Sequence, residues 1–126
     1  MATGKDLRRL ALALDGTAEA PHFDRAAFRV ERIYVTLAGD ARTANFKFTP
    51  DEQALKCTVA PEAFAPVPNA WGQQGWTTAT LSALSAAELK AALEMAFAHA
   101  VPRTPKRRRA KGGKDRAGKT DLKRLI

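Results

Sequence analysis

Apolar residues near both ends of the first hundred positions recur at the spacing of an amphipathic helix. The first stripe ends before a glycine and consists of Leu7, Leu10, Ala11 and Leu14. The second stripe ends before Pro102 and consists of Leu89, Leu93, Ala96, Phe97 and Ala100. Thr3 with Asp6, and Ser85 with Glu88, have the spacing of a capping box. Each stripe is therefore predicted to be a helix with a capped N-terminus.

Short apolar runs between these helices predict β-strands. Three of them, at residues 27–30, 33–37 and 44–48, are separated by polar turns and predict an antiparallel meander. A fourth run covers residues 76–81. Three prolines predict an extended path over residues 61–70, because proline fixes its own backbone angle and disfavours helix in the residue before it.

A short helix completes the pattern between the third and fourth strands. Thr49, Pro50 and Glu52 match a helix start and predict a helix from residue 50 to about residue 58. The predicted order is α-β-β-β-α-β-α. Helices interspersed with antiparallel strands indicate the α+β class, here an antiparallel sheet backed by helices.

Charge divides the chain into two parts. Residues 103–126 hold 11 basic and 2 acidic residues, a net charge of 11 − 2 = +9. Residues 1–102 hold 10 basic and 11 acidic residues, a net charge of 10 − 11 = −1. A run of like charges without aromatic residues does not bury enough apolar surface to offset the entropy of ordering. We therefore expect one folded domain at residues 1–102 and a disordered basic tail at residues 103–126.

Side chains with catalytic or metal-binding chemistry are few and scattered. His22 and His99 lie far apart and have no partners at ligand spacing, so we expect no metal site and no cofactor. Cys57 is the only cysteine, which excludes an internal disulfide and indicates a reducing compartment, so we expect a cytoplasmic protein. No apolar run is long enough to span a membrane. Because no nucleophile has an adjacent base, the sequence predicts no enzyme.

Four segments together resemble the MmcQ/YjbR family of small bacterial proteins. They stand at residues 22–25, 28–30, 45–52 and 71–78 and read HFDR, FRV, NFKFTPDE and WGQQGWTT. The resemblance covers about residues 5–101 and implies a compact α+β domain described as DNA-binding, with no catalytic residues to transfer. Two features depart from the family: Glu31-Arg32 replaces the usual glycine-lysine turn, and most members lack the basic tail.

Strand alternation predicts an outer sheet face that mixes cations, hydroxyls and one aromatic ring. If Phe28 and Phe46 face the helices, alternation places Arg29, Asn45 and Lys47 on the other face. The fourth strand would add Trp76, Thr78 and Thr80 to that face. Such a surface suits phosphates and unpaired bases, but a solvated polar face is also normal for an antiparallel sheet.

The WGQQGW segment at residues 71–76 has two interpretations. Gly72 and Gly75 can adopt positive φ, so the segment can turn tightly and anchor Trp71 and Trp76 in the structure. The alternative is a loop that grips a ligand. No Lys-Ser or Lys-Thr pair follows it, so it is not a phosphate loop, and a structural turn is the better account.

The basic tail points to a polyanionic partner. Its predicted nucleic-acid contacts are Arg103, Lys106, Arg107, Arg108, Arg109, Lys111, Lys114, Arg116 and Lys119, assisted by Arg29, Lys47 and Trp76 of the domain. We expect DNA rather than RNA, bound with low sequence specificity because phosphates look alike. The alternatives are a protein-interaction module with a solubilising tail, or a tail that binds an anionic membrane surface.

Overall fold

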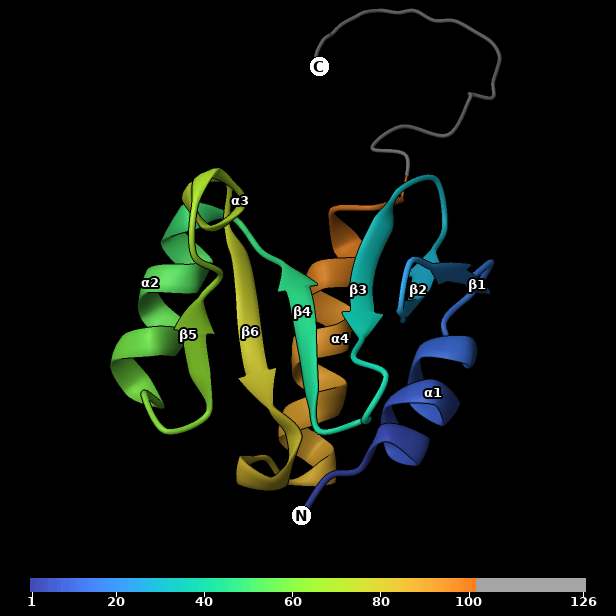
Figure 1. Cartoon of the computed structure of the whole chain (residues 1–126), viewed down its shortest axis with the longest axis horizontal. Coiled ribbons are helices and arrows are strands. Elements are labelled where there is room, and N and C mark those ends of the chain that lie inside the picture. Colours follow the sequence, from blue (N-terminus) through green and yellow to red (C-terminus); the bar gives the residue numbers. More distant parts are fainter. Residues whose placement is uncertain (102–126) are drawn as a thin grey trace, which may run out of the picture.

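A six-stranded antiparallel sheet forms the framework of the protein (Figure 1). The computed structural model describes residues 1–101. The strands are β1 (Ala18–His22), β2 (Arg25–Arg29), β3 (Ile33–Leu37), β4 (Thr43–Lys47), β5 (Phe64–Pro66) and β6 (Trp76–Thr80). They lie in the order β1-β2-β3-β4-β6-β5. The helices are α1 (Gly4–Leu12), α2 (Pro50–Val59), α3 (Ala70–Gln73) and α4 (Ala86–Ala98), with a 3₁₀ turn at Leu81–Ala83. The α+β class with an antiparallel sheet is confirmed.

The three longer helices begin where the sequence predicts. Each has a complete capping box, in which the side chains of the first and fourth residues satisfy each other's backbone amides. In α4, for example, the Ser85 amide donates to Glu88 Oε1 at 2.8 Å and the Glu88 amide donates to Ser85 Oγ at 3.0 Å. Local sequence therefore sets where each of these helices starts.

The hydrophobic core lies between one face of the sheet and the helices. Figure 1 shows α4 behind the central strands, and α1 contacts α4 while α2 contacts β5 and β6. Phe28, Phe46 and Phe48 are fully buried on this side, as alternation predicts. Val35 of β3 pairs with both Phe28 and Phe46 and is also fully buried. None of the three longer helices covers the opposite face, which only the short helix α3 borders, beside β6.

Strands β1 and β5 and helix α3 are absent from the predicted order. Strand β1 is exposed along its whole length and contains Pro21, so it lacks the alternation of apolar and polar residues that predicts a strand, and it pairs with β2 at the edge of the sheet. Strand β5 and helix α3 lie within or beside the proline-rich stretch and span three and four residues. Elements this short form because the chain packs beside β6, rather than because of local propensity.

An irregularity in β3 turns one aromatic residue toward the helices. Phe28 pairs with Val35 and Arg29 pairs with Ile33, so Tyr34 is the extra residue of a bulge. Its ring is buried and packs edge-on against Phe97 of α4 at a centroid distance of 5.6 Å. Its hydroxyl hydrogen-bonds the Thr17 hydroxyl at 2.8 Å. Burial raises the pKa of Tyr34 above its ordinary value of 10.0.

Candidate nucleic-acid interface

A cavity of about 200 Å³ lies on the open face of the sheet. We call it the sheet-face cavity, and its lining residues are His22, Arg25, Thr36, Asn45, Val67, Trp71 and Trp76. They come from β1, β2, β3, β4, the proline-rich stretch, α3 and β6, so the cavity crosses the sheet. None of the seven carries a carboxylate, although acidic residues outnumber basic ones in the domain. The local electrostatics therefore favour a neutral or anionic ligand.

Polar groups in the sheet-face cavity are held by neighbouring strands. Arg25 donates from Nε to the Thr36 hydroxyl at 2.8 Å and from Nη2 to the Thr36 carbonyl at 3.2 Å. Asn45 Oδ1 accepts a hydrogen bond from the Thr78 hydroxyl at 2.8 Å. Asn45 is paired with Thr36 on one side and Thr78 on the other, so these side chains share one face. The guanidinium and the amide are thus oriented before any ligand arrives.

The segment WGQQGW brings both tryptophans to the cavity. Gly75 has a φ of +107°, as predicted, and a Cβ there would overlap the Phe48 carbonyl. Gly72 is required for a different reason than predicted: it lies in α3 without positive φ, and a Cβ would overlap the Val67 carbonyl. Trp71 is not the buried anchor that the turn interpretation implies, because it is 58% exposed.

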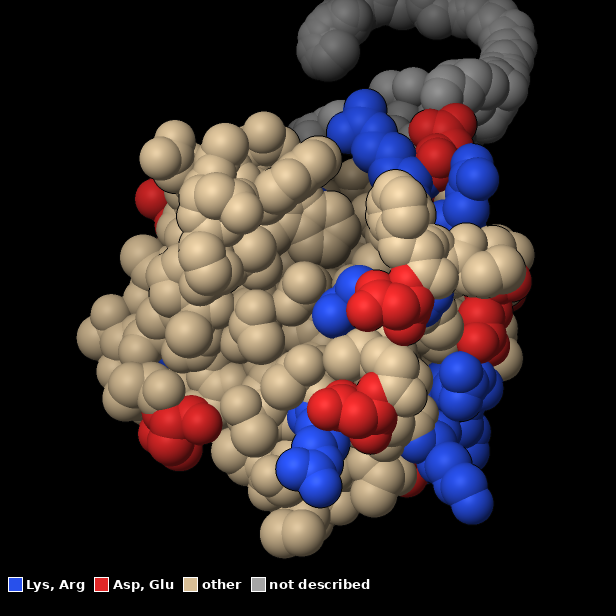
Figure 2. Space-filling model, in the orientation of Figure 1, with Lys and Arg blue, Asp and Glu red and all other residues tan. Residues whose placement is uncertain are grey.

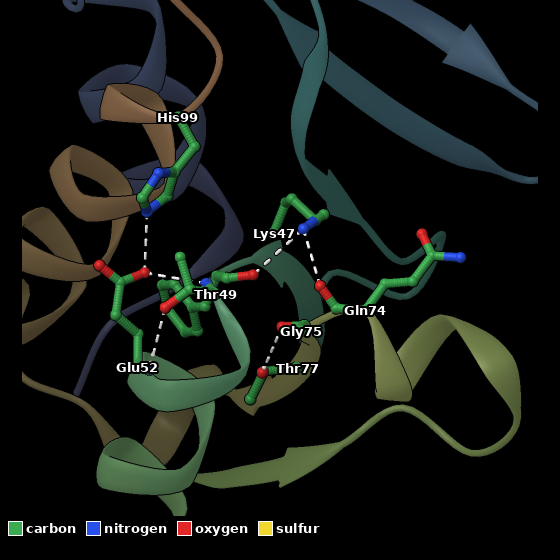
Figure 3. Close-up of polar contacts among 8 residues, drawn as sticks. Lys47, Thr49, Glu52, Gln74, Gly75, Thr77 and His99 are labelled. Atoms are coloured by element: carbon green, nitrogen blue, oxygen red, sulfur yellow. Dashed lines mark hydrogen bonds and ion pairs between the residues drawn. The ribbon is translucent and has the colours of Figure 1, made fainter.

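Lys47 attaches the end of β4 to this segment (Figure 3). Its ammonium donates to the Gln74 carbonyl at 2.8 Å and to the Phe48 carbonyl at 3.2 Å. Two of its three donors are therefore used within the fold, and one is left for a ligand. Figure 3 also shows the Thr77 hydroxyl donating to the Gly75 carbonyl, at 2.9 Å. These bonds hold the turn that precedes Trp76.

A second cavity opens where β3 and β4 stop pairing. This strand-end cavity, of about 190 Å³, is lined by Arg32, Ile33, Tyr34, Lys47, Trp76, Ala96, His99 and Ala100. The last pair of the ladder at this end is Val35 with Phe46, so the bulge at Tyr34 leaves Lys47 without a partner in β3. Trp76 lines both cavities, which makes it the residue that they share.

A charged contact joins the C-terminal end of α4 to the start of α2. His99 Nε2 lies 2.8 Å from Glu52 Oε1, and the same carboxylate oxygen accepts from the Thr49 amide at 3.0 Å (Figure 3). Burial acts to raise the pKa of Glu52, but hydrogen bonds from Thr49 and His99 outweigh it and lower the pKa. His99 also lines the strand-end cavity, so this contact holds part of its wall in place.

We expect Glu52→Gln to lower the free energy of unfolding by about 1 kcal/mol at neutral pH, because it removes a charge-assisted hydrogen bond. The folded pKa lies below the ordinary value of 4.5, so this contribution is present above pH 4.5 and is lost as the pH falls through the folded pKa. Urea unfolding at a series of pH values measures it. Glu88→Gln, in a capping box whose carboxylate has no histidine partner, should change stability less. Equal losses in both variants would contradict the assignment.

The predicted site residues of the domain do not all converge. Trp76 lines both cavities and Lys47 lines the strand-end cavity, whereas Arg29 is exposed and lines neither. The predicted contacts at residues 103–119 lie outside the described residues, as does the predicted tail from residue 103 onward. Sequence reasoning missed Arg25 and Trp71. Arg25 is four residues before Arg29 and therefore lies on the same face of β2. A predicted strand that began two residues earlier would have included Arg25.

Charges on the open face are mixed. Figure 2 shows Lys and Arg side chains interspersed with Asp and Glu toward the β1 and β2 side, whereas the part over β5, β6 and α3 is largely uncharged. The domain therefore presents no continuous basic surface on this face.

Within residues 1–101, no three potential metal ligands among His, Cys, Asp and Glu come together. Burial raises the pKa of the Cys57 thiol, which reduces its nucleophilic character.

Comparison with known proteins assigns the family. The sequence profile of the YjbR family matches residues 12–99. The chain belongs to the YjbR family. A crystal structure of Deinococcus radiodurans protein DR2400, which has a domain described as DUF419, resembles this YjbR protein with a TM-score of 0.67. The two are 23% identical over 77% of each chain, which supports a shared fold. The comparison with curated proteins gives no match. None of the helices in residues 1–101 has the length and apolar run that a membrane crossing requires.

Proposed function

We propose that this YjbR protein binds nucleic acid, DNA rather than RNA, with low sequence specificity and without catalysing a reaction. The main contact is electrostatic and comes from the cations of residues 103–126. The observation that carries the proposal is the separation of charge: +9 in the last 24 residues against −1 in the preceding 102. Phosphates attract such a segment whatever the base sequence, because the contact reads the backbone.

The open sheet face supports the proposal in a secondary way. Its cavity has no acidic lining residue and offers Arg25, while Lys47 keeps one free donor nearby. Two cations attract a polyanion only weakly, so the domain would add contacts to a complex that the tail forms.

The test is a titration of the full chain with duplex DNA at several salt concentrations. If about six cations meet phosphates, the logarithm of the affinity should fall with the logarithm of salt concentration with a slope near −5.

The alternative, a protein-interaction module, is favoured by the exposed Leu55 and Val59, one turn apart on α2. Two results would support that alternative: an affinity for DNA that does not change with salt concentration, and a protein partner that stays bound after nuclease treatment and a wash at about 0.5 M salt.

A further inference from the structure

Aromatic side chains, two of them exposed, gather around the sheet-face cavity. Trp71 and Trp76 line it together with His22, and the Phe23 ring packs edge-on against His22 at a centroid distance of 4.9 Å. Trp71 is 58% exposed and Phe23 is 93% exposed. Neither ring belongs to the hydrophobic core, so core packing does not explain their position.

Phe23 is held at a cost to the fold. It occupies the two-residue turn between His22 and Arg25 with a φ of +59°, a conformation that favours glycine. A left-handed backbone costs a residue with a Cβ about 1 kcal/mol or more. Because the ring is almost fully exposed, no burial offsets this cost. A strained and solvent-exposed aromatic ring at the tip of a hairpin points to contact with a ligand.

The polar groups beside these rings suit the edge of a nucleobase. The Asn45 side chain uses its carbonyl oxygen to accept from Thr78, and within residues 1–101 its amide nitrogen has no hydrogen-bond acceptor. Arg25 is oriented by Thr36 and donates from two of its three nitrogens there, which leaves Nη1 for a ligand. Unpaired bases are recognised by stacking on aromatic rings with hydrogen bonds to their edges.

We propose that the sheet-face cavity holds one unpaired base of a single-stranded nucleic acid. The base stacks on the exposed tryptophan surface of Trp71 and Trp76, its edge faces Asn45 and Arg25, and Phe23 contacts a neighbouring base. This inference rests on the proposed function and extends it: the tail supplies affinity for any polyphosphate, and the cavity adds a preference for unpaired bases. A base within a duplex is excluded, because its faces are covered by its neighbours in the stack.

The experiment compares two single-stranded DNAs of about 12 nucleotides, one with bases and one that is abasic at every position. Both carry the same phosphates, so the tail attracts both alike. We expect the full chain to bind the strand with bases at least about 5-fold more tightly. Trp71→Ala should abolish this preference and leave affinity for the abasic strand unchanged. The matched control is Leu55→Ala, which removes an exposed apolar side chain from α2 and should preserve the preference.

The outcomes separate the two proposals. Equal affinity of the full chain for both strands would overturn the base site and leave the proposed function standing. Binding to neither strand nor to duplex DNA would overturn the proposed function. A preference that survives in Trp71→Ala, with the variant folded by circular dichroism, would overturn the assignment of this cavity.

A second variant distinguishes ligand contact from a structural role. Phe23→Gly should raise the melting temperature, because glycine accepts the positive φ without strain, and should reduce the preference for the strand with bases. A variant that is less stable than the natural chain would overturn the strain argument. One that retains the full preference would remove Phe23 from the site.

Discussion

Replacing Lys106, Arg107, Arg108 and Arg109 together with glutamine should weaken binding to duplex DNA on the order of 10² to 10³-fold at about 0.1 M salt. Each cation that meets a phosphate releases condensed counterions, and four fewer contacts should make the slope of log affinity against log salt shallower by about 3 to 4. Fluorescence anisotropy of a labelled duplex across salt concentrations measures both quantities. The chain length is preserved, so only charge changes.

The matched control removes four cations from the domain. Lys5, Arg9, Arg42 and Lys90 are exposed, and none of them lines the sheet-face cavity or the strand-end cavity. Their replacement by glutamine changes the net charge by the same amount and should reduce affinity far less, because the remaining tail still reaches the phosphates. Equal losses in the two variants would mean that net charge alone governs binding and would contradict a contact made by the tail.

Gly75→Ala should lower the free energy of unfolding by about 3 kcal/mol. Two costs add: a residue with a Cβ is strained at a φ of +107°, and the added methyl group overlaps the Phe48 carbonyl and approaches Thr49. Relief would require the turn between α3 and β6 to move away from β4. Because the Gly75 carbonyl accepts from the Phe48 amide at 3.3 Å, such a movement would also break a backbone hydrogen bond. Chemical denaturation monitored by tryptophan fluorescence measures the loss.

Gly16→Ala separates the two costs. Gly16 also has a positive φ, +81°, but a Cβ there would meet only Val30 Cγ1, at 3.7 Å. This variant should therefore lose only the backbone cost, about 1 kcal/mol. If both variants lose the same amount, the close approach of Gly75 to Phe48 does not contribute to stability.

Short-range signals predicted most of the regular structure. The capping boxes at Thr3, Thr49 and Ser85 all form, since each depends only on residues three positions apart. Strand alternation correctly placed Phe46 in the core and Asn45 on the outer face, because successive side chains of a strand point to opposite sides.

The sequence did not predict contacts between residues that are far apart along the chain. Glu52 and His99 are far apart in the sequence, and nothing in the pattern around either residue pairs them. The bulge at Tyr34 interrupts the alternation that the sequence implies, and it opens the strand-end cavity. Trp71 was expected to be an anchor because the glycines of WGQQGW predicted a turn that holds both tryptophans, yet the four-residue helix α3 leaves its ring exposed beside the sheet.

Composition and local pattern determined the fold class, the capped helix starts and the concentration of positive charge at residues 103–126, because these depend on neighbouring residues or on simple counts. The assembly of the sheet-face cavity was decided only in three dimensions. The strand order β1-β2-β3-β4-β6-β5 brings His22 and Arg25 to the same cavity as Trp71 and Trp76. Backbone hydrogen bonds between strands that are far apart in the sequence bring these residues together, and no short stretch of sequence encodes that arrangement.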